Sequence, residues 1–205
     1  MKSTSKGFFC AALVASVSQM FVAQTTVASD LYTIKDGKLE RPTGYREWVF
    51  VGTPLTPNDM NNGKATFPEF HNVYLDRQSW NQWKEKGTVR DGAIMVKEMV
   101  SVGTKSAPSG SGYFEGDYIG LEISIKDSKH FPKEPGNWAY FSFTTDGKTL
   151  KETTSALPTE KCNACHAALA ADDFMFTQYY PVLRAGKGTG IEATGGFNSK
   201  LTPAK

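Results

Sequence analysis

The chain has 205 residues, which is enough for one domain with a substantial hydrophobic core. Its basic and acidic residues nearly balance, with a formal net charge of +2, and the sequence has no run of like charges. This composition, rich in aromatic residues, is typical of a globular protein and gives no indication of a nucleic-acid-binding surface.

Residues 1–28 have the pattern of a cleaved secretory signal peptide. Two lysines precede the apolar residues 7–22, and the small-residue segment 26–28 resembles a cleavage site, so Ser29 is the expected first residue of the mature protein. An uncleaved membrane anchor is the alternative, but the apolar stretch is short and is interrupted by serine. Cleavage removes one of the three cysteines and two positive charges, which leaves the mature chain with no net formal charge.

Residues 29–205 are expected to form a single domain whose last ~15 residues, rich in glycine and threonine, are disordered. Residues 29–44 are polar and contain turn residues, which predicts a loose segment. Residues 45–52 favour a strand or a short helix, and residues 53–63 have the composition of a loop.

Residues 67–75 alternate well enough to predict a strand, and a helix is expected to follow it. Asp76 has the position of an N-cap, and Gly87 has that of the residue after the helix end. Trp80 and Trp83 lie between them at helical spacing, and we interpret both as core residues.

Two long strands are expected at 93–102 and 113–126, joined by a flexible connector and followed by a third strand at 137–145. Side chains alternate between the two faces of a strand. In the first strand one face carries Ile94, Val96, Val100 and Val102, and the other carries Ala93, Met95, Lys97, Met99 and Ser101. In the second strand one face carries Ile119, Leu121, Ile123 and Ile125, and the other carries Tyr118, Gly120, Glu122 and Ser124. Lys97 lies between two methionines on a face whose other side chains indicate shelter from solvent, but this pattern alone favours an ordinary solvent-facing residue for both Lys97 and Glu122.

The alanine-rich segment 158–171 predicts a helix with Thr159 as its N-cap. Asp172 or Asp173 is expected to cap a further short helix at residues 174–179, which the following proline would end. The first of these two helices carries the motif that indicates the chemistry of the chain.

Residues 162–166 read Cys-Asn-Ala-Cys-His, which is the attachment motif of a c-type haem. Each thiol forms a thioether with one vinyl group of the porphyrin. Cys162 and Cys165 lie about one helical turn apart, so both can reach one edge of the macrocycle. His166 follows directly, and its imidazole can bind the iron. Because c-type haem is attached on the oxidising side of the membrane, the motif and the signal peptide together predict the bacterial periplasm.

A bare Cys-x-x-Cys pair also occurs in redox proteins and in zinc sites. The zinc alternative requires a second pair of ligands, and no cysteine remains in the mature chain to supply it. The redox alternative would not require a histidine beside the pair. The sequence therefore favours haem c, with one covalently attached haem per chain.

The position of the motif separates the classes of c-type cytochrome. Small helical electron carriers have it near the N-terminus and a distal methionine far downstream, whereas Met175 follows His166 too closely to reach the opposite face of the iron. Met60, Met95 and Met99 precede the motif and are alternative ligands, but no feature of the sequence marks one of them, so a vacant sixth position is favoured over a second axial ligand. The helical cytochromes c′ share a C-terminal motif and a vacant position, but they require four long amphipathic helices, and this chain offers at least three strands and few helices.

The mature chain resembles cytochrome P-460 of ammonia-oxidising bacteria over nearly its whole length. The resemblance implies an α+β fold in which an antiparallel β-sheet dominates a single domain, with a few helices, a C-terminal haem-attachment helix and commonly a homodimer. The segments that carry it are YREWVFVGTPLTPND, RDGAIMVKEMVSVG, GYFEGDYIGLEISIKDS, EPGNWAYF and CNACHAALAADDFMFTQYYPVLRA.

The resemblance also implies a second covalent link, from a lysine nitrogen to a meso carbon of the porphyrin. The matching residue is Lys97, in the segment VKEMVSVG, and this implication replaces the solvent-facing interpretation. A distal carboxylate is associated with competence for oxidation, and its matching position is Glu122. A related branch, the beta-sheet cytochromes c′, lacks the lysine link and mainly binds small gaseous ligands.

The resemblance implies oxidation of hydroxylamine to nitrous oxide, via an iron nitrosyl, at a five-coordinate haem bound by His166, and binding of nitric oxide. In this hypothesis Glu122 accepts protons, and Lys97 tunes the macrocycle. The expected electron acceptor is a soluble periplasmic protein such as a cytochrome c. The chain is expected to bind no nucleic acid and, once the signal peptide is cleaved, no membrane. Alternatives are non-enzymatic nitric oxide binding and, less favoured, simple electron transfer. Candidates for an apolar distal wall are Phe67, Phe70, Phe114 and Met99.

Overall fold

The computed structural model describes residues 31–145 and 149–188, so the predicted signal peptide and the predicted disordered tail lie outside the described residues. Its centre is a five-stranded antiparallel sheet in the order β3-β4-β5-β8-β9. These strands are β3 (Val49–Gly52), β4 (Phe70–Leu75), β5 (Ala93–Val102), β8 (Glu115–Lys126) and β9 (Trp138–Ser142).

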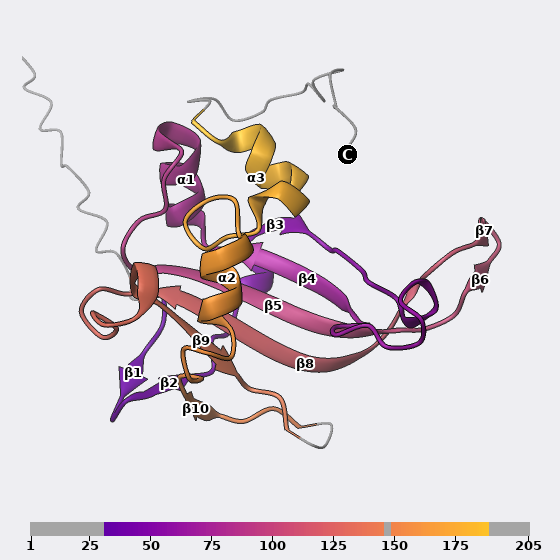
Figure 1. Ribbon diagram of the computed structural model, residues 1–205, viewed down its shortest axis with the longest axis horizontal. Helices are drawn as coiled ribbons and strands as arrows, with labels where there is room; N and C mark the ends of the chain where they lie inside the picture. Colours follow the sequence, from indigo (N-terminus) through magenta and orange to yellow (C-terminus); the bar gives the residue numbers. More distant parts are fainter. Residues whose placement is uncertain (1–30, 146–148, 189–205) are drawn as a thin grey trace, which may run out of the picture.

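Smaller elements surround this sheet (Figure 1). The outer strands are β1 (Ile34–Lys35), β2 (Lys38–Glu40), β10 (Thr153–Ser155), β6 (Ser106–Ala107) and β7 (Gly110–Ser111), the last two at the tip of a long arm formed by β5 and β8. The α-helices are α1 (Arg77–Lys86), α2 (Asn163–Leu169) and α3 (Pro181–Gly186). Among the described residues, no helix is long and apolar enough to cross a membrane. The predicted α+β, antiparallel-sheet-dominated domain with a C-terminal helix is confirmed.

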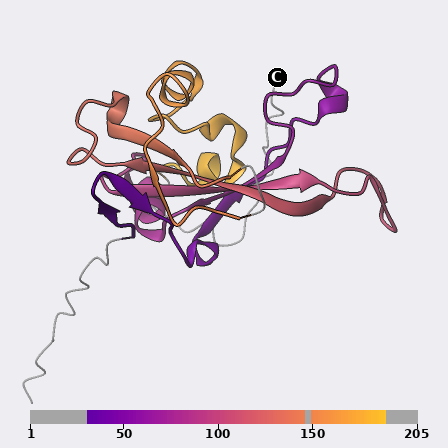
Figure 2. The same ribbon diagram turned by 90° about the horizontal axis from the view of Figure 1, so that it is seen from below.

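The sheet separates two apolar cores. On one face, α1 and α3 contribute Trp83 and Leu183, which pack in a cluster with Met95 of β5. On the other face, Leu39 of β2 packs in a cluster with Ile94. Figure 2 shows α2 and α3 on one side of the sheet and β1 and β2 on the other. The predicted alternation of β5 is confirmed, because its odd-numbered and even-numbered apolar residues enter different cores.

Helix α1 has the predicted caps. The Asp76 carboxylate accepts a hydrogen bond from the backbone N–H of Ser79 at 2.8 Å, and Gly87 ends the helix with a φ of 67°. Trp83 is buried and donates its indole N–H to the carbonyl oxygen of Leu183 at 2.8 Å. The prediction that it is a core residue is therefore confirmed, and the bond joins α1 to α3.

Strands β5 and β8 pair without a break up to Met99, which lies opposite Gly120. Within this ladder Lys97 lies opposite Glu122. Because directly paired residues of antiparallel strands project from the same face, the register alone brings these two side chains together.

Beyond Met99 the register shifts, so that Val100 lies opposite Tyr118. The extra residue in β8 forms a bulge, so Tyr118 projects from the face opposite to that of Glu122, and the register shifts a second time between Val100 and Val102. The prediction that Tyr118 shares a face with Glu122 is therefore wrong, as is the placement of Ile119 with the core residues, since Ile119 is exposed.

Several segments contain more structure than the sequence predicts. The segment 29–44 contains β1 and β2, and the connector after β5 contains the β6–β7 hairpin. Residues 45–52 contain both predicted alternatives, a 3₁₀ helix at Tyr45–Glu47 and then β3. The pairs β1–β2 and β6–β7 are short local hairpins, and β2 also pairs with the distant strand β10.

The start of α2 differs from the prediction. The N-cap is Cys162, and Thr159 lies before the helix, where its hydroxyl donates to a carboxylate oxygen of Glu134 at 2.7 Å. The predicted helix at 174–179 is reduced to a 3₁₀ turn at Thr177–Tyr179. Pro181 begins α3 instead of ending a helix, since its fixed φ suits the first helical position.

Glu98 is a buried carboxylate that the sequence analysis did not single out. It lies on the even-numbered face of β5 and is 1% exposed. One of its oxygens accepts hydrogen bonds from the Tyr45 hydroxyl at 2.6 Å and from Arg46 Nε at 2.7 Å. Burial and the bond to Glu98 raise the pKa of Tyr45 above its ordinary value. Glu98 therefore ties the 3₁₀ helix before β3 to the centre of the sheet.

We expect Glu98→Ala to lower the free energy of unfolding by about 2 kcal/mol, because the partly buried Tyr45 hydroxyl loses its acceptor and Arg46 loses its ion-pair partner. Urea unfolding of the holoprotein measures this change. Glu115→Ala, at an exposed position of β8, is the matched control and should change stability by less than ~0.5 kcal/mol. Equal stabilities of the two variants would contradict a structural role for Glu98.

Candidate haem site

The motif lies at the start of α2, on the face of the sheet that α1 and α3 also cover. Cys162 is partly buried against the core, Cys165 is exposed, and both thiols are free. Asn163 anchors the helix, because its side-chain amide donates to the carbonyl oxygen of Trp138 at 2.6 Å. The helix therefore holds two thiols one turn apart beside the start of β9.

His166 is held in one orientation. Its Nδ1 donates a hydrogen bond to the carbonyl oxygen of Phe174 at 2.7 Å, which leaves the lone pair on Nε2. The rings of Tyr140 and Phe176 lie on the imidazole, with centroid distances of 4.5 Å and 4.6 Å. Burial lowers the pKa of His166, so the imidazole is kept in the neutral form that binds metals.

The environment of Cys162 differs from that of a redox-active pair. Burial, with a smaller contribution from Glu122, raises the pKa of the Cys162 thiol, whereas reactive Cys-x-x-Cys pairs have a lowered pKa. Among the described residues no group of three or more His, Cys, Asp or Glu side chains is arranged to hold a metal ion, so a zinc site has no support there.

Lys97 and Glu122 form an ion pair on the same face of the sheet. Both are largely shielded from solvent, with side chains 24% and 28% exposed. The Lys97 ammonium also lies 5.2 Å from the centroid of the Phe67 ring. Ser124, two residues from Glu122 on the same face of β8, pairs with Tyr140, whose ring centroid lies 4.5 Å from that of His166, so the pair and the motif share one face of the sheet. The structure thus brings all five predicted site residues together.

The candidates for the distal wall separate into two groups. Phe67 and Met99 lie near Lys97, the first through its ring and the second by the alternation of β5. Phe70 pairs with Val100 and so projects from the opposite face. Phe114 lies in the arm, where its carbonyl oxygen accepts from the backbone of the connector. Only the first two fit the predicted role.

His71 is a site residue that the sequence analysis missed. It pairs with Met99 and so shares the face of Lys97, and its ring meets Phe67 with a centroid distance of 5.9 Å. Its Nε2 lies 3.3 Å from a carboxylate oxygen of Glu69. The alternation of residues 70–75 could have identified it, because this alternation puts His71 on the same face of β4 as the core residue Val73.

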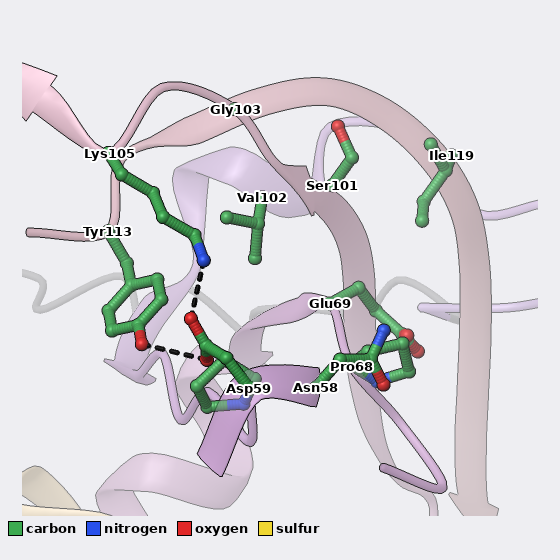
Figure 3. Close-up of a pocket in the computed structure, with 11 residues that line it drawn as sticks. Asn58, Asp59, Pro68, Glu69, Ser101, Val102, Gly103, Lys105, Tyr113 and Ile119 are labelled. Atoms are coloured by element: carbon green, nitrogen blue, oxygen red, sulfur yellow. Dashed lines mark hydrogen bonds and ion pairs between the residues drawn. The ribbon is translucent and has the colours of Figure 1, made fainter. Parts of the chain in front are cut away.

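A separate cavity of about 460 Å³ lies farther along β5, where the arm meets the segment 57–69 (Figure 3). Lys105 and Tyr113 of the arm both reach Asp59 across it, the tyrosine at 2.8 Å. Glu69 lines this cavity, but Lys97, Glu122 and His166 do not. The contacts with Asp59 fasten the arm to the segment before β4. The cavity is distinct from the haem site.

The residues present fit a covalently bound haem. They supply two free thiols one turn apart, a neutral imidazole with its Nε2 lone pair available, and apolar and aromatic walls. The hydroxyl of Tyr140 is buried without a hydrogen-bond partner beside His166. Because buried polar groups are nearly always paired, this hydroxyl has room for a hydrogen-bond partner that the protein does not supply, which is compatible with a bound group beside His166.

Comparison with known proteins gives one family. A comparison with curated proteins found no match. The family described as Cytochrome P460 matches residues 42–177, which covers the sheet, the motif and the turn that follows α2. The match extends over more than half of the chain and confirms the resemblance, and the family implies haem with iron. The chain therefore belongs to the Cytochrome P460 family and is a haem cytochrome.

Proposed function

We propose that the protein is a periplasmic c-type haem enzyme that oxidises hydroxylamine to nitrous oxide. Cys162 and Cys165 would hold the haem by thioether bonds, and His166 would bind the iron. Lys97 would be bonded to the porphyrin through Nζ. The observation that carries this proposal is the Lys97–Glu122 pair, which lies on one face of the sheet beside the attachment motif.

The bound haem supplies the position at which hydroxylamine is held and the redox chemistry. The overall reaction converts two hydroxylamine molecules into one nitrous oxide and one water, and it releases four protons and four electrons. The protons require an acceptor inside the site. Glu122 is a carboxylate with restricted access to solvent, as such an acceptor requires.

The lysine link would change the electrostatics of Glu122. A lysine nitrogen bonded to an aromatic carbon is uncharged at neutral pH, so Glu122 would lose its ion-pair partner when the link forms. Its carboxylate would then be free to accept a proton from the substrate. Lys97 itself would hold the macrocycle in place and tune its electronic properties.

The electrons would pass to a soluble periplasmic acceptor such as a cytochrome c. We also propose a homodimer, and the exposed aromatic residues Phe50 and Tyr118, on the sheet face opposite to Lys97, support it. The second candidate function is binding of nitric oxide without turnover. The apolar side chains of Phe67 and Met99 favour it, because they suit a small uncharged ligand.

The first test is the absorption spectrum of the dithionite-reduced protein, before and after denaturation. A strongly red-shifted Soret band that does not become a normal c-type haemochrome is the expected result, because the macrocycle is covalently modified. Steady consumption of hydroxylamine with an artificial electron acceptor is the second measurement. A normal haemochrome together with nitric oxide binding and no consumption would instead assign the protein to the gas-binding branch.

A further inference from the structure

The carbonyl group that orients His166 belongs to an unusual turn. Asp172 and Met175 are joined by a hydrogen bond from the Met175 N–H to the Asp172 carbonyl oxygen at 2.7 Å. The two central residues, Asp173 and Phe174, have φ values of 42° and 62°. Positive φ at both central positions is the pattern of a type I′ turn, which strongly favours Asn-Gly and disfavours a large aromatic residue.

A turn of this kind with Phe174 in it persists only if contacts outside the turn hold it. Asp173 supplies two of them. Its carboxylate is 2.5 Å from the Lys126 ammonium at the end of β8, and it accepts from the Trp138 indole N–H at 3.3 Å. The Phe174 ring supplies a third, because it packs on Gly136 so closely that an added Cβ would lie 2.3 Å from the ring.

These contacts connect the central sheet to the proximal side of the haem site. Lys126 and Trp138 are directly paired on β8 and β9, so they form a rigid base for Asp173. Because Asp173 is held in this way, the turn fixes the position of the Phe174 carbonyl oxygen, which His166 Nδ1 contacts at 2.7 Å. Partners at the second nitrogen of a metal-binding histidine fix its orientation and raise its basicity.

We propose that Asp173 is a positioning residue that sets the strength of the His166–Phe174 hydrogen bond, and through it the donor strength of the proximal ligand. A stronger bond at Nδ1 increases electron donation from Nε2 and favours ferric iron. This inference rests on the proposed ligation of iron by His166, but it does not depend on which substrate is oxidised. The anchor of Lys126, Asp173 and Trp138 would therefore hold the reduction potential low.

The test uses the holoprotein with Lys126→Met or Asp173→Asn. The second variant keeps an acceptor for Trp138 and a residue type that tolerates positive φ, but it loses the charge. In both variants we expect the iron–histidine stretching band of the reduced protein to move to lower frequency and the midpoint potential to rise. Resonance Raman spectroscopy and spectroelectrochemistry measure these two quantities.

Lys105→Met is the matched control, because it also removes a lysine that pairs with an aspartate, at the distant arm. It should leave the band and the potential unchanged. If Lys126→Met and Asp173→Asn lower thermal stability but keep both readouts of the parent protein, the anchor is only structural and the inference is wrong. Absence of an iron–histidine band in the parent protein would instead contradict ligation by His166, which belongs to the proposed function.

Discussion

Glu122→Ala is expected to keep its haem and its substrate binding while losing most of its turnover. The side chain lies opposite Lys97 on β5, where it can reach the neighbourhood of the motif but contributes little to either apolar core. If it accepts protons during oxidation, its removal should lower the turnover number by ~10²-fold or more. Steady-state kinetics with hydroxylamine, together with the affinity measured by ligand titration, separates binding from turnover.

Glu122→Gln shows whether proton acceptance or the size of the Glu122 side chain matters, and Glu115→Ala is the control. Glu122→Gln keeps the size of the side chain but accepts protons poorly, so it should be nearly as inactive as Glu122→Ala. Glu115→Ala removes a carboxylate from an exposed position of the same strand and should remain fully active. Unchanged turnover in both Glu122 variants would remove this residue from the mechanism.

Lys97→Met is expected to give the spectrum of an ordinary five-coordinate c-type haem and to lose hydroxylamine oxidation. Methionine has a similar length and apolar character, so packing near Phe67 should be retained while the nitrogen is lost. Attachment through Cys162 and Cys165 should persist, since it involves a different edge of the macrocycle. The measurements are the reduced absorption spectrum and the mass of the haem-bound peptides.

Lys97→Arg separates charge from covalent bonding. The guanidinium keeps the positive charge beside Glu122, but it is a poor nucleophile, so this variant should also show an unmodified haem. Recovery of the red-shifted band in Lys97→Arg would mean that the charge, and not a covalent link, produces the spectrum. A red-shifted band in Lys97→Met would show that another residue carries the link.

The sequence predicted those features that depend on local periodicity. The bounds of β5, the caps of α1 and the separation of Met95 from Ile94 follow from alternation and from capping residues, and all are confirmed. The alternation also puts Lys97 on the face that carries Met95 and Met99. The resemblance was needed to give that lysine a role, because a lone lysine on a strand is ordinarily solvated.

Features that depend on distant contacts were not predictable. The pairing of Lys97 with Glu122 requires the register of two strands, and that register also fixes the position of the bulge, which the flanking Gly116 and Gly120 alone do not specify. The Asp172–Met175 turn lacks the glycine that normally identifies its type, because its strain is offset by Lys126 and Trp138. Glu98 was missed because a buried carboxylate is recognised only by its partners.

The bulge in β8 also separates the arm from the site. The ladder that holds Lys97 opposite Glu122 ends at Met99, and the register shifts before the chain reaches the β6–β7 tip. An insertion or deletion between β6 and β7 would lengthen or shorten the arm without changing any pair on the site side of the bulge. The tip of the arm, beyond the contacts of Lys105 and Tyr113 with Asp59, is therefore free to vary in length and composition while the geometry of the haem site is preserved.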